Sequence, residues 1–153
     1  MALMVEQLND PEFIQLPLGN MPLRICASPD YLTSYGTPKT VEDLKSHKLI
    51  LYGGENADML NGQFPHDLIK NPKQFILVTN GSSMNTALTN GLGIGCSVYN
   101  KNNIKMNSLI DVFPDMPDKV IPYYLTYHHR LEGSPKIKAF YEFLKNEVVD
   151  AWQ

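Results

Sequence analysis

The chain has 153 residues, of which 43% are hydrophobic and 19% charged, so it is long enough for one ordinary domain with a core and is unlike a disordered segment. Its formal net charge of −3 argues against a nucleic-acid-binding surface over the whole domain, and no apolar run approaches the roughly 18 residues that span a bilayer. The first ten residues lack the basic segment and long apolar core of a signal peptide, so we expect a cytoplasmic protein.

Two strands and a short helix are predicted near the N-terminus. Residues 13–18 and 23–27 are strand-like apolar runs, and residues 19–20 (Gly-Asn) offer a turn between them. Residues 28–29 (Ser-Pro) are typical of an N-cap followed by the first helical position. Gly36 is expected to close this helix.

The next segment contains one more helix, one more strand and a long loop. Residues 40–43 (Thr-Val-Glu-Asp) resemble a capping box and predict a helix that ends near Ser46. Residues 48–52 predict a strand. Residues 53–72 are polar and broken by Gly, Asn and Pro, which indicates an irregular loop with one helical turn.

A strand–helix–strand unit is predicted in the middle of the chain. It runs from a buried strand over residues 75–79 to a second strand over residues 94–99. Ser82 or Ser83 is expected to cap the helix between them, and Gly91 to end it. Such a unit implies a parallel sheet with a right-handed crossover. The helix presents one narrow apolar face, formed by Met84, Ala87 and Leu88.

The last third of the chain completes an α/β pattern. A short helix is expected over residues 101–107, and strands over residues 109–113 and 121–127. Ser134 and the proline after it predict the start of an amphipathic helix that runs to about Ala151. Its apolar face consists of Ile137, Phe140, Tyr141, Leu144 and Val148.

The turn before the central helix is the best candidate for chemistry. Unsatisfied amides at a helix start suit a carboxylate or another small anion, above all with two hydroxyls and the Asn80 amide nearby. The alternative is that Ser82 and Ser83 only cap the helix and turn the chain.

Other motifs do not indicate catalysis, a metal or a cofactor. Gly91-x-Gly93-x-Gly95 closes a helix and enters a strand, whereas a dinucleotide fingerprint follows a strand and opens a helix. His128 and His129 would point to opposite faces of a strand, and no second cluster has metal-ligand spacing. We therefore expect no catalytic residues, no metal ligands and no cofactor.

The two cysteines, Cys26 and Cys96, each lie inside a strand-like apolar run. We expect buried free thiols, as in a reducing compartment, with a disulfide between them as the alternative.

Four stretches, in order and in register, resemble the regulatory domain of LysR-type transcriptional regulators. Residues 24–32 (Arg-Ile-Cys-Ala-Ser-Pro-Asp-Tyr-Leu) are similar to the family's strand followed by Ala-Ser-Pro-x-Tyr-Leu. Residues 35–47 are similar to its Gly-x-Pro, Asp-Leu and His segment, and residues 87–95 to its helix ending in Gly-Leu-Gly-Ile. Residues 134–140 are similar to its final Ser-Pro-x-x-x-x-Phe helix, so that the resemblance extends over residues 4–144.

The resemblance implies an α/β fold of the periplasmic-binding-protein type (type II), with two lobes joined by hinge strands. Residues 23–120 would form a nearly complete second lobe, and residues 1–22 and 121–153 part of the first lobe. The hinge strands would be residues 23–28 and 121–127. A DNA-binding region, a linker helix and the start of the first lobe would be missing, as in an expressed fragment or a truncated reading frame.

The resemblance also implies an effector-sensing module and not an enzyme. A small anionic effector, such as a carboxylate, would bind in the cleft and alter how an attached helix-turn-helix acts on DNA. We expect a homo-oligomer, no DNA binding by this chain alone and no membrane association. The anionic group would be bound by Asn80, Gly81, Ser82 and Ser83, with Arg24, Tyr124 and Tyr127 lining the hinge side. Arg24 could equally be a surface strand residue.

Two rival functions use similar frames. A transport solute-binding protein of the same fold would need a signal peptide, and an enzyme would need a clustered nucleophile or acid–base pair.

The missing part of the first lobe would leave the last helix without partners. We expect its apolar face to be covered by folding back on the second lobe or, preferably, by a swapped dimer.

Overall fold

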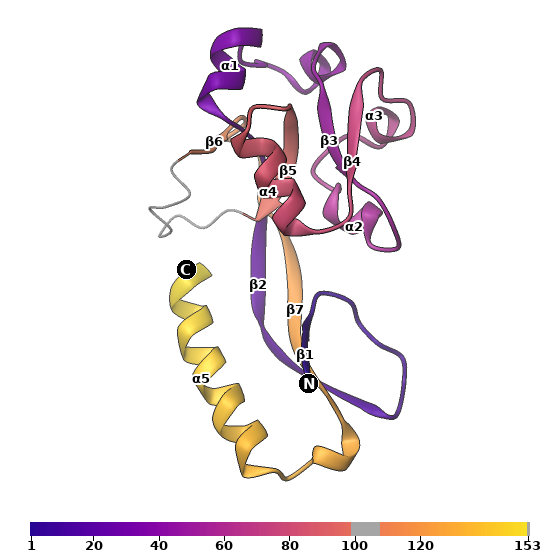
Figure 1. Ribbon diagram of the computed structural model, residues 1–153, viewed down its shortest axis with the longest axis vertical. Helices are drawn as coiled ribbons and strands as arrows, with labels where there is room; N and C mark the ends of the chain where they lie inside the picture. The colour runs from indigo at the N-terminus through magenta and orange to yellow at the C-terminus, as the bar shows by residue number, and fades with distance from the viewer. Residues whose placement is uncertain (99–107, 153) are drawn as a thin grey trace. The chain divides into compact units, whose positions relative to one another are not determined.

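The structure, a computed structural model, describes residues 1–98 and 108–152, with side chains up to residue 147 (Figure 1). The short helix expected over residues 101–107 lies outside the described residues. Within them the chain divides into two compact units. Unit 1 comprises residues 1–22 and 120–152, and unit 2 comprises residues 23–98 and 108–119.

Unit 2 is built on an open mixed sheet. β2 (Phe13–Ala27) reaches into it from unit 1, and the order of its neighbours is β2-β5-β3-β4, where β5 is Ile94–Val98, β3 is Leu49–Tyr52 and β4 is Phe75–Val78. β3 is parallel to both β4 and β5, whereas β2 is antiparallel to β5. β6 (Ile110–Asp111) adds a short antiparallel pairing to the end of β2.

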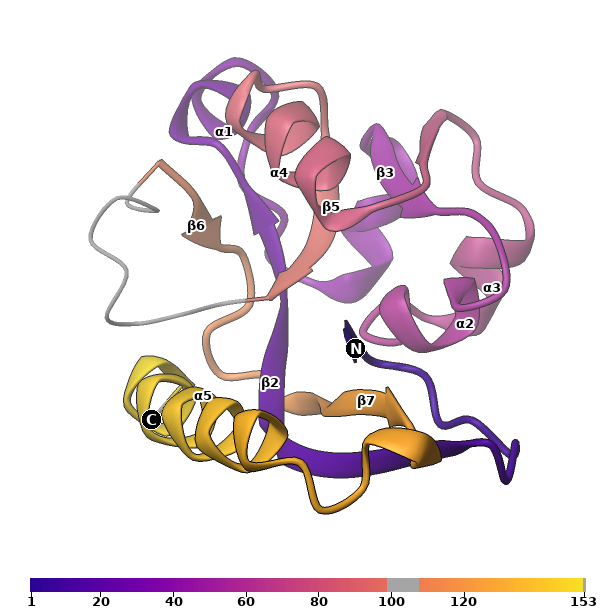
Figure 2. The same ribbon diagram turned by 60° about the horizontal axis from the view of Figure 1, so that its bottom comes forward.

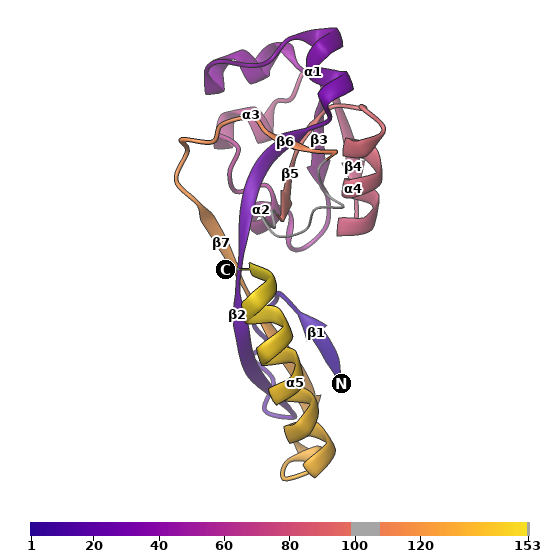
Figure 3. The same ribbon diagram turned by 90° about the vertical axis from the view of Figure 1, so that its left-hand side faces the viewer.

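The predicted strand–helix–strand unit is confirmed as β4, α4 (Gly81–Thr89) and β5. Because β3 lies between β4 and β5, the helix crosses over the middle strand. Figure 3 shows α4 on one face of these strands and α3 (His66–Lys70) toward the other. The expected apolar face packs on the sheet against Ile50, Tyr52 and Val78, and it consists of Met84, Ala87 and Leu88.

Gly95 lets α4 approach the sheet closely. A Cβ at this position would lie 2.7 Å from Met84 Sδ and 3.0 Å from the carbonyl oxygen of Ile50. A side chain at Gly95 would therefore push the helix off its strand.

Two helix starts predicted from the sequence are confirmed. In α1 (Pro29–Tyr35) the Ser28 hydroxyl accepts a hydrogen bond from the Tyr31 amide at 3.1 Å, and Gly36 ends the helix with φ of 86°. The capping box opens η1 (Val41–Ser46), in which the Asp43 carboxylate accepts from the Thr40 amide at 2.9 Å. This second helix is a 3-10 helix of six residues, longer than the three or four residues at which most 3-10 helices stop.

Two local predictions were wrong in extent. The loop over residues 53–72 contains two short helices, α2 (Ala57–Leu60) and α3. Phe64 and Leu68 are buried, and Asn61 bonds the segment to the main chain of Tyr52 in β3. The strand expected over residues 109–113 is only the two residues of β6, since its pairing is limited to the last two residues of β2. The strand predicted over residues 94–99 is confirmed over Ile94–Val98, and residue 99 lies outside the described residues.

The predicted turn at residues 19–20 is absent, and β2 is one strand of 15 residues. A two-residue hairpin turn there would need left-handed φ at both central residues (type I′) or φ near 60° at the first (type II′). Gly19 has φ of 156° and continues the strand, while Asn20 is not among the residues with positive φ. The neighbouring strand β7 (Lys119–His128) keeps this part of β2 extended.

Unit 1 is a small sheet with one helix. β1 (Ala2–Met4) pairs antiparallel with β7, which lies next to β2. α5 (Pro135–Trp152) runs beside β2 and β7 (Figure 2). Its Phe140, Tyr141 and Leu144 pack against a cluster of Leu18, Tyr123 and Leu125, and the Tyr141 hydroxyl donates to the carbonyl of Pro17 at 2.8 Å.

The expectation that α5 lacks partners in its own lobe was therefore wrong. Ile137 is buried, and Phe140, Tyr141 and Leu144 are half-buried against the strands of unit 1, whereas Phe143, outside the predicted apolar face, is 58% exposed. The strands of unit 1 cover part of this face, and the swapped dimer stays a prediction. The side chains of Val148 and Trp152 lie outside the described residues.

Candidate functional site

The start of α4 lies at the carboxyl edge of the parallel strands of unit 2, directly after β4. Its N-cap is Asn80, whose side-chain oxygen accepts a hydrogen bond from the Ser83 amide at 2.8 Å. The prediction that Ser82 or Ser83 caps the helix was wrong, because the helix begins earlier, at Gly81. Asn80 has the extended backbone of an N-cap, with φ of −152° and ψ of 165°.

Capping by Asn80 leaves other donors at this helix start available. The amides of Gly81 and Ser82 and the hydroxyls of Ser82 and Ser83 have no hydrogen-bond partner among the residues described. Residues 80–83 are all exposed, and the first turn of α4 carries no acidic residue. The arrangement offers donors and a positive helix end to a small anion.

Tyr52, the last residue of β3, adds a hydroxyl beside this helix start. A Cβ at Gly81 would lie 3.8 Å from the Tyr52 hydroxyl oxygen. Burial raises the pKa of Tyr52 to about 12, so the hydroxyl keeps its proton and can donate. Tyr52 is not among the site residues predicted from the sequence. Its position at the carboxyl end of a parallel strand, where ligands bind in open α/β sheets, was the available signal.

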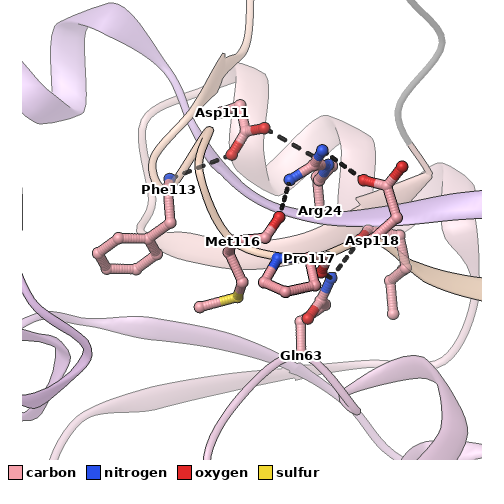
Figure 4. Close-up of polar contacts among 8 residues, drawn as sticks. Arg24, Gln63, Asp111, Phe113, Met116, Pro117 and Asp118 are labelled. Carbon is pink, nitrogen blue, oxygen red and sulfur yellow. Dashed lines mark hydrogen bonds and ion pairs between the residues drawn. The ribbon is translucent and has the colours of Figure 1, made fainter.

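Arg24 lies at the same edge, because it pairs with Ser97 near the end of β5. Its guanidinium contacts three partners within unit 2 (Figure 4). Nη1 donates to the carbonyl of Met116 at 2.7 Å, Nε lies 3.6 Å from a carboxylate oxygen of Asp111, and Nη2 pairs with Asp118. Two carboxylates already balance its charge, which favours a role in fastening the segment after β6 over a role as the effector's cation.

Tyr124 and Tyr127, the other predicted site residues, belong to β7 in unit 1. Tyr124 is half-buried and lies opposite Met4 in the β1–β7 register. Tyr127 is buried, with 6% of its surface exposed. Within unit 2, the structure thus brings Arg24 and residues 80–83 to one edge of the sheet, and the two tyrosines lie in the other unit.

The prediction that His128 and His129 point to opposite faces of a strand was wrong. The rings of His128 and His129 have centroids 4.6 Å apart. The reason is that β7 ends at His128 and a 3-10 turn, η3 (His129–Leu131), begins there. His128 Nδ1 accepts from the Arg130 amide at 3.2 Å. In the part of the chain that the structure describes, no group of three or more His, Cys, Asp or Glu side chains could hold a metal ion.

The cysteines are buried free thiols, as expected. Cys96 pairs with Ile25 and Cys26 with Gly95, so the two side chains project to opposite faces of the sheet and cannot form a disulfide. Burial raises the pKa of Cys26 to about 12 and also raises the pKa of Cys96.

The described helices include none that is both long enough and apolar enough to cross a bilayer.

Comparison with known proteins gives matches along nearly the whole chain. A family model described as the LysR substrate binding domain matches residues 1–149. The HTH-type transcriptional regulator CrgA of Neisseria meningitidis serogroup C (strain 8013) is 26% identical over 153 residues, which cover 96% of this chain and 50% of CrgA. The uncharacterized HTH-type transcriptional regulator YhjC of Escherichia coli (strain K12) is 30% identical over 149 residues, 90% of this chain and 48% of YhjC.

A solved structure agrees with these matches. The regulatory domain of CrgA from Neisseria meningitidis superposes with a TM-score of 0.74 at 25% identity, covering 95% of this chain and 73% of that chain. The present chain therefore spans about half the length of the curated relatives that it matches, and a larger share of their regulatory domain.

Proposed function

Because this chain belongs to the LysR substrate-binding domain family, we propose that it senses a small anionic effector, such as a carboxylate, at the start of α4. It is an effector-sensing regulatory domain, and its open mixed sheet with helices is the periplasmic-binding-protein-like (type II) fold of LysR regulatory domains, as expected. A role as a transport solute-binding protein is not favoured, since the relatives are transcriptional regulators.

The observation that carries the proposal is the set of free donors at the start of α4. Asn80 caps the helix, while the amides of Gly81 and Ser82 and the hydroxyls of Ser82 and Ser83 remain unpaired among the described residues. The Tyr52 hydroxyl lies next to Gly81. A carboxylate has acceptors for several of these donors, and the helix end favours its charge.

The remaining features of the whole protein are proposals that follow from the family. LysR regulators bind small effectors and form oligomers. Here, effector binding would modulate transcription through an attached helix-turn-helix, in a cytoplasmic homo-oligomer. Arg24, Tyr124 and Tyr127 would line the hinge side of the site, Arg24 chiefly by holding residues 111–118 in place. The chain would bind its ligand without converting it, and it would not bind duplex DNA specifically without its partner region.

The sharpest test changes the charge at the helix start but keeps the cap. Asn80→Asp retains a side-chain acceptor for the Ser83 amide, and a carboxylate at an N-cap is as stabilising as an amide. It also places a negative charge where the effector's anionic group would bind. We expect unchanged thermal stability and at least about tenfold weaker binding of acetate in an NMR titration, a loss of about 1.4 kcal/mol.

The matched control is Asn71→Asp, which adds the same charge at an exposed position of unit 2, after α3. It should bind acetate like the parent protein. Binding by one helix start is weak, about −4 kcal/mol at a millimolar Kd, so concentrations must reach tens of millimolar. Equal acetate affinity of the parent and Asn80→Asp would contradict the proposed site.

A second test removes donors without touching the cap. Because Asn80 and not a serine caps α4, Ser82→Ala and Ser83→Ala should leave the unfolding free energy within about 0.5 kcal/mol of the parent. Each should still weaken acetate binding. Two variants that bind as tightly as the parent would place the anion elsewhere.

A further inference from the structure

A pocket of about 410 Å³ opens in unit 2 at the amino edge of the parallel strands. Lys48 directly precedes β3, Gln74 directly precedes β4, and Leu92 lies two residues before β5. The start of α4 follows β4 and so lies at the carboxyl edge, at the other end of these strands. The pocket is therefore separate from the site proposed above. Its volume falls in the range of small-molecule sites.

One wall of this amino-edge pocket is aromatic and held in place. The rings of Tyr31 and Tyr35 stack with centroids 4.8 Å apart and planes 27° apart. Tyr31 is buried, and its hydroxyl oxygen accepts from the Lys48 amide at 3.2 Å and lies 2.9 Å from His47 Nδ1. Tyr35 is 69% exposed, so that its ring offers a free surface on a fixed support.

The polar part of the lining carries a positive charge. The side chains of Ser46, Lys48 and Gln74 are exposed, and none has a hydrogen-bond or ion-pair partner among the described residues. No carboxylate of the described residues lines the pocket. Leu92, 44% exposed, adds an apolar surface. A single ammonium group, two neutral polar groups and an aromatic wall thus face the same space.

We propose that this amino-edge pocket is a second ligand site, which binds a flat aromatic anion. The ring would lie against Tyr35 and Leu92, where burial of apolar surface favours it. The anionic group would pair with the Lys48 ammonium, and Gln74 and Ser46 would donate to it. An aliphatic anion would leave the aromatic wall exposed, and a neutral aromatic compound would leave the ammonium unpaired.

The test is a titration of the whole chain with benzoate, followed by backbone amide shifts in NMR spectra. We expect saturable shifts centred on Ser46, Gln74 and Leu92. Acetate, which lacks the ring, and benzyl alcohol, which lacks the charge, should each bind at this pocket at least about tenfold more weakly. The titration should run to at least about a 20-fold molar excess of benzoate over protein and to tens of millimolar benzoate. The absence of any shift of these amides over that range would overturn the proposal.

Two variants locate the interactions. Lys48→Gln should weaken benzoate binding about tenfold, because it removes the charge from an exposed position without disturbing the core. Tyr35→Ala should also weaken benzoate binding, because it removes the aromatic ring against which the ligand would lie. The matched control is Lys39→Gln, an exposed lysine outside the pocket whose side chain has no partner in the described chain. Equal losses of benzoate affinity in Lys48→Gln and Lys39→Gln would show only a general effect of charge and would contradict the proposed ligand site.

The outcome does not depend on the effector site at α4. Asn80→Asp should leave the benzoate-induced shifts of Ser46 and Gln74 unchanged, whereas Lys48→Gln should leave acetate binding at Gly81 and Ser82 unchanged. Loss of both responses in either variant would mean that a single site had been titrated, and the second site would be rejected.

Discussion

Asn61 holds the main chain of Tyr52 at two points. Its Nδ2 donates to the Tyr52 carbonyl at 2.8 Å, and its Oδ1 accepts from the Tyr52 amide at 2.9 Å. Asn61 is 1% exposed, and it lies in the segment between α2 and α3. Since the Tyr52 hydroxyl lies beside the start of α4, this pair fixes the end of β3 at the edge where we propose that the effector binds.

Asn61→Ala should destabilise unit 2 by about 2–4 kcal/mol. Both main-chain groups of Tyr52 would lose a buried partner, and an unpaired buried polar group costs about 1–3 kcal/mol. Urea unfolding followed by circular dichroism measures the loss. Asn71→Ala, at an exposed asparagine after α3 with no side-chain hydrogen bond among the described residues, should change stability by less than about 0.5 kcal/mol. Equal stability of the two variants would show that the two hydrogen bonds between Asn61 and Tyr52 contribute little to stability.

Arg24→Met should destabilise the fold by about 1–3 kcal/mol, because it retains the apolar stem but leaves Asp111 without its cation. The Arg24 side chain is only 13% exposed, so solvent replaces the lost contacts poorly. Arg130→Met, at an exposed arginine whose side chain has no partner in the described residues, serves as the control. Thermal melts at two salt concentrations provide the comparison, and an Arg24→Met protein as stable as the parent would rule out the fastening role.

Acidification should destabilise the protein partly through His47. Burial lowers the pKa of His47 below its usual 6.5, while Asp43 acts weakly in the opposite direction. The unfolded chain then binds the proton more readily than the folded chain. Stability should therefore fall as the pH drops below about 6.5, until the folded-state pKa is passed. The neutral ring can accept the Tyr31 proton at Nδ1, 2.9 Å away, and the protonated ring cannot.

The measurement is the urea midpoint of the parent and of His47→Gln between pH 8 and pH 5. We expect a smaller fall with pH in His47→Gln than in the parent. The matched substitution is His66→Gln, at an exposed histidine of α3. If His47→Gln and the parent show the same slope, burial of His47 does not contribute to the pH dependence.

Neither thiol should react in the folded protein. Cys26 is 1% exposed and Cys96 is fully buried, and at pH 8 a thiol with a pKa of about 12 is a thiolate in only about one molecule in ten thousand. We expect no labelling by a disulfide reagent in buffer and two thiols per chain in guanidinium. Because the side chains lie on opposite faces of the sheet, an oxidant should not join them. Rapid labelling of the folded chain would contradict this arrangement.

Local structure was readable from the sequence where near neighbours decide it. The Ser28 cap, the end of α1 at Gly36 and the buried face of α4 depend on residues within about four positions of one another. The α/β class followed from the alternation of strand and helix patterns, and the family resemblance came from short motifs in order. All of these signals lie along the chain, so no knowledge of distant contacts was needed.

Tertiary structure decided the features that involve distant partners. β2 continues through Gly19 because β7, about a hundred residues later, lies beside it. The charge of Arg24 is taken up by Asp111 and Asp118, and Tyr52 reaches the start of α4 only because β3 lies between β4 and β5. A side chain's partners across a sheet are set by strand order and register. The composition of a single strand specifies neither the strand order nor the register. For that reason the residues that shape the candidate site could be identified only in the folded chain.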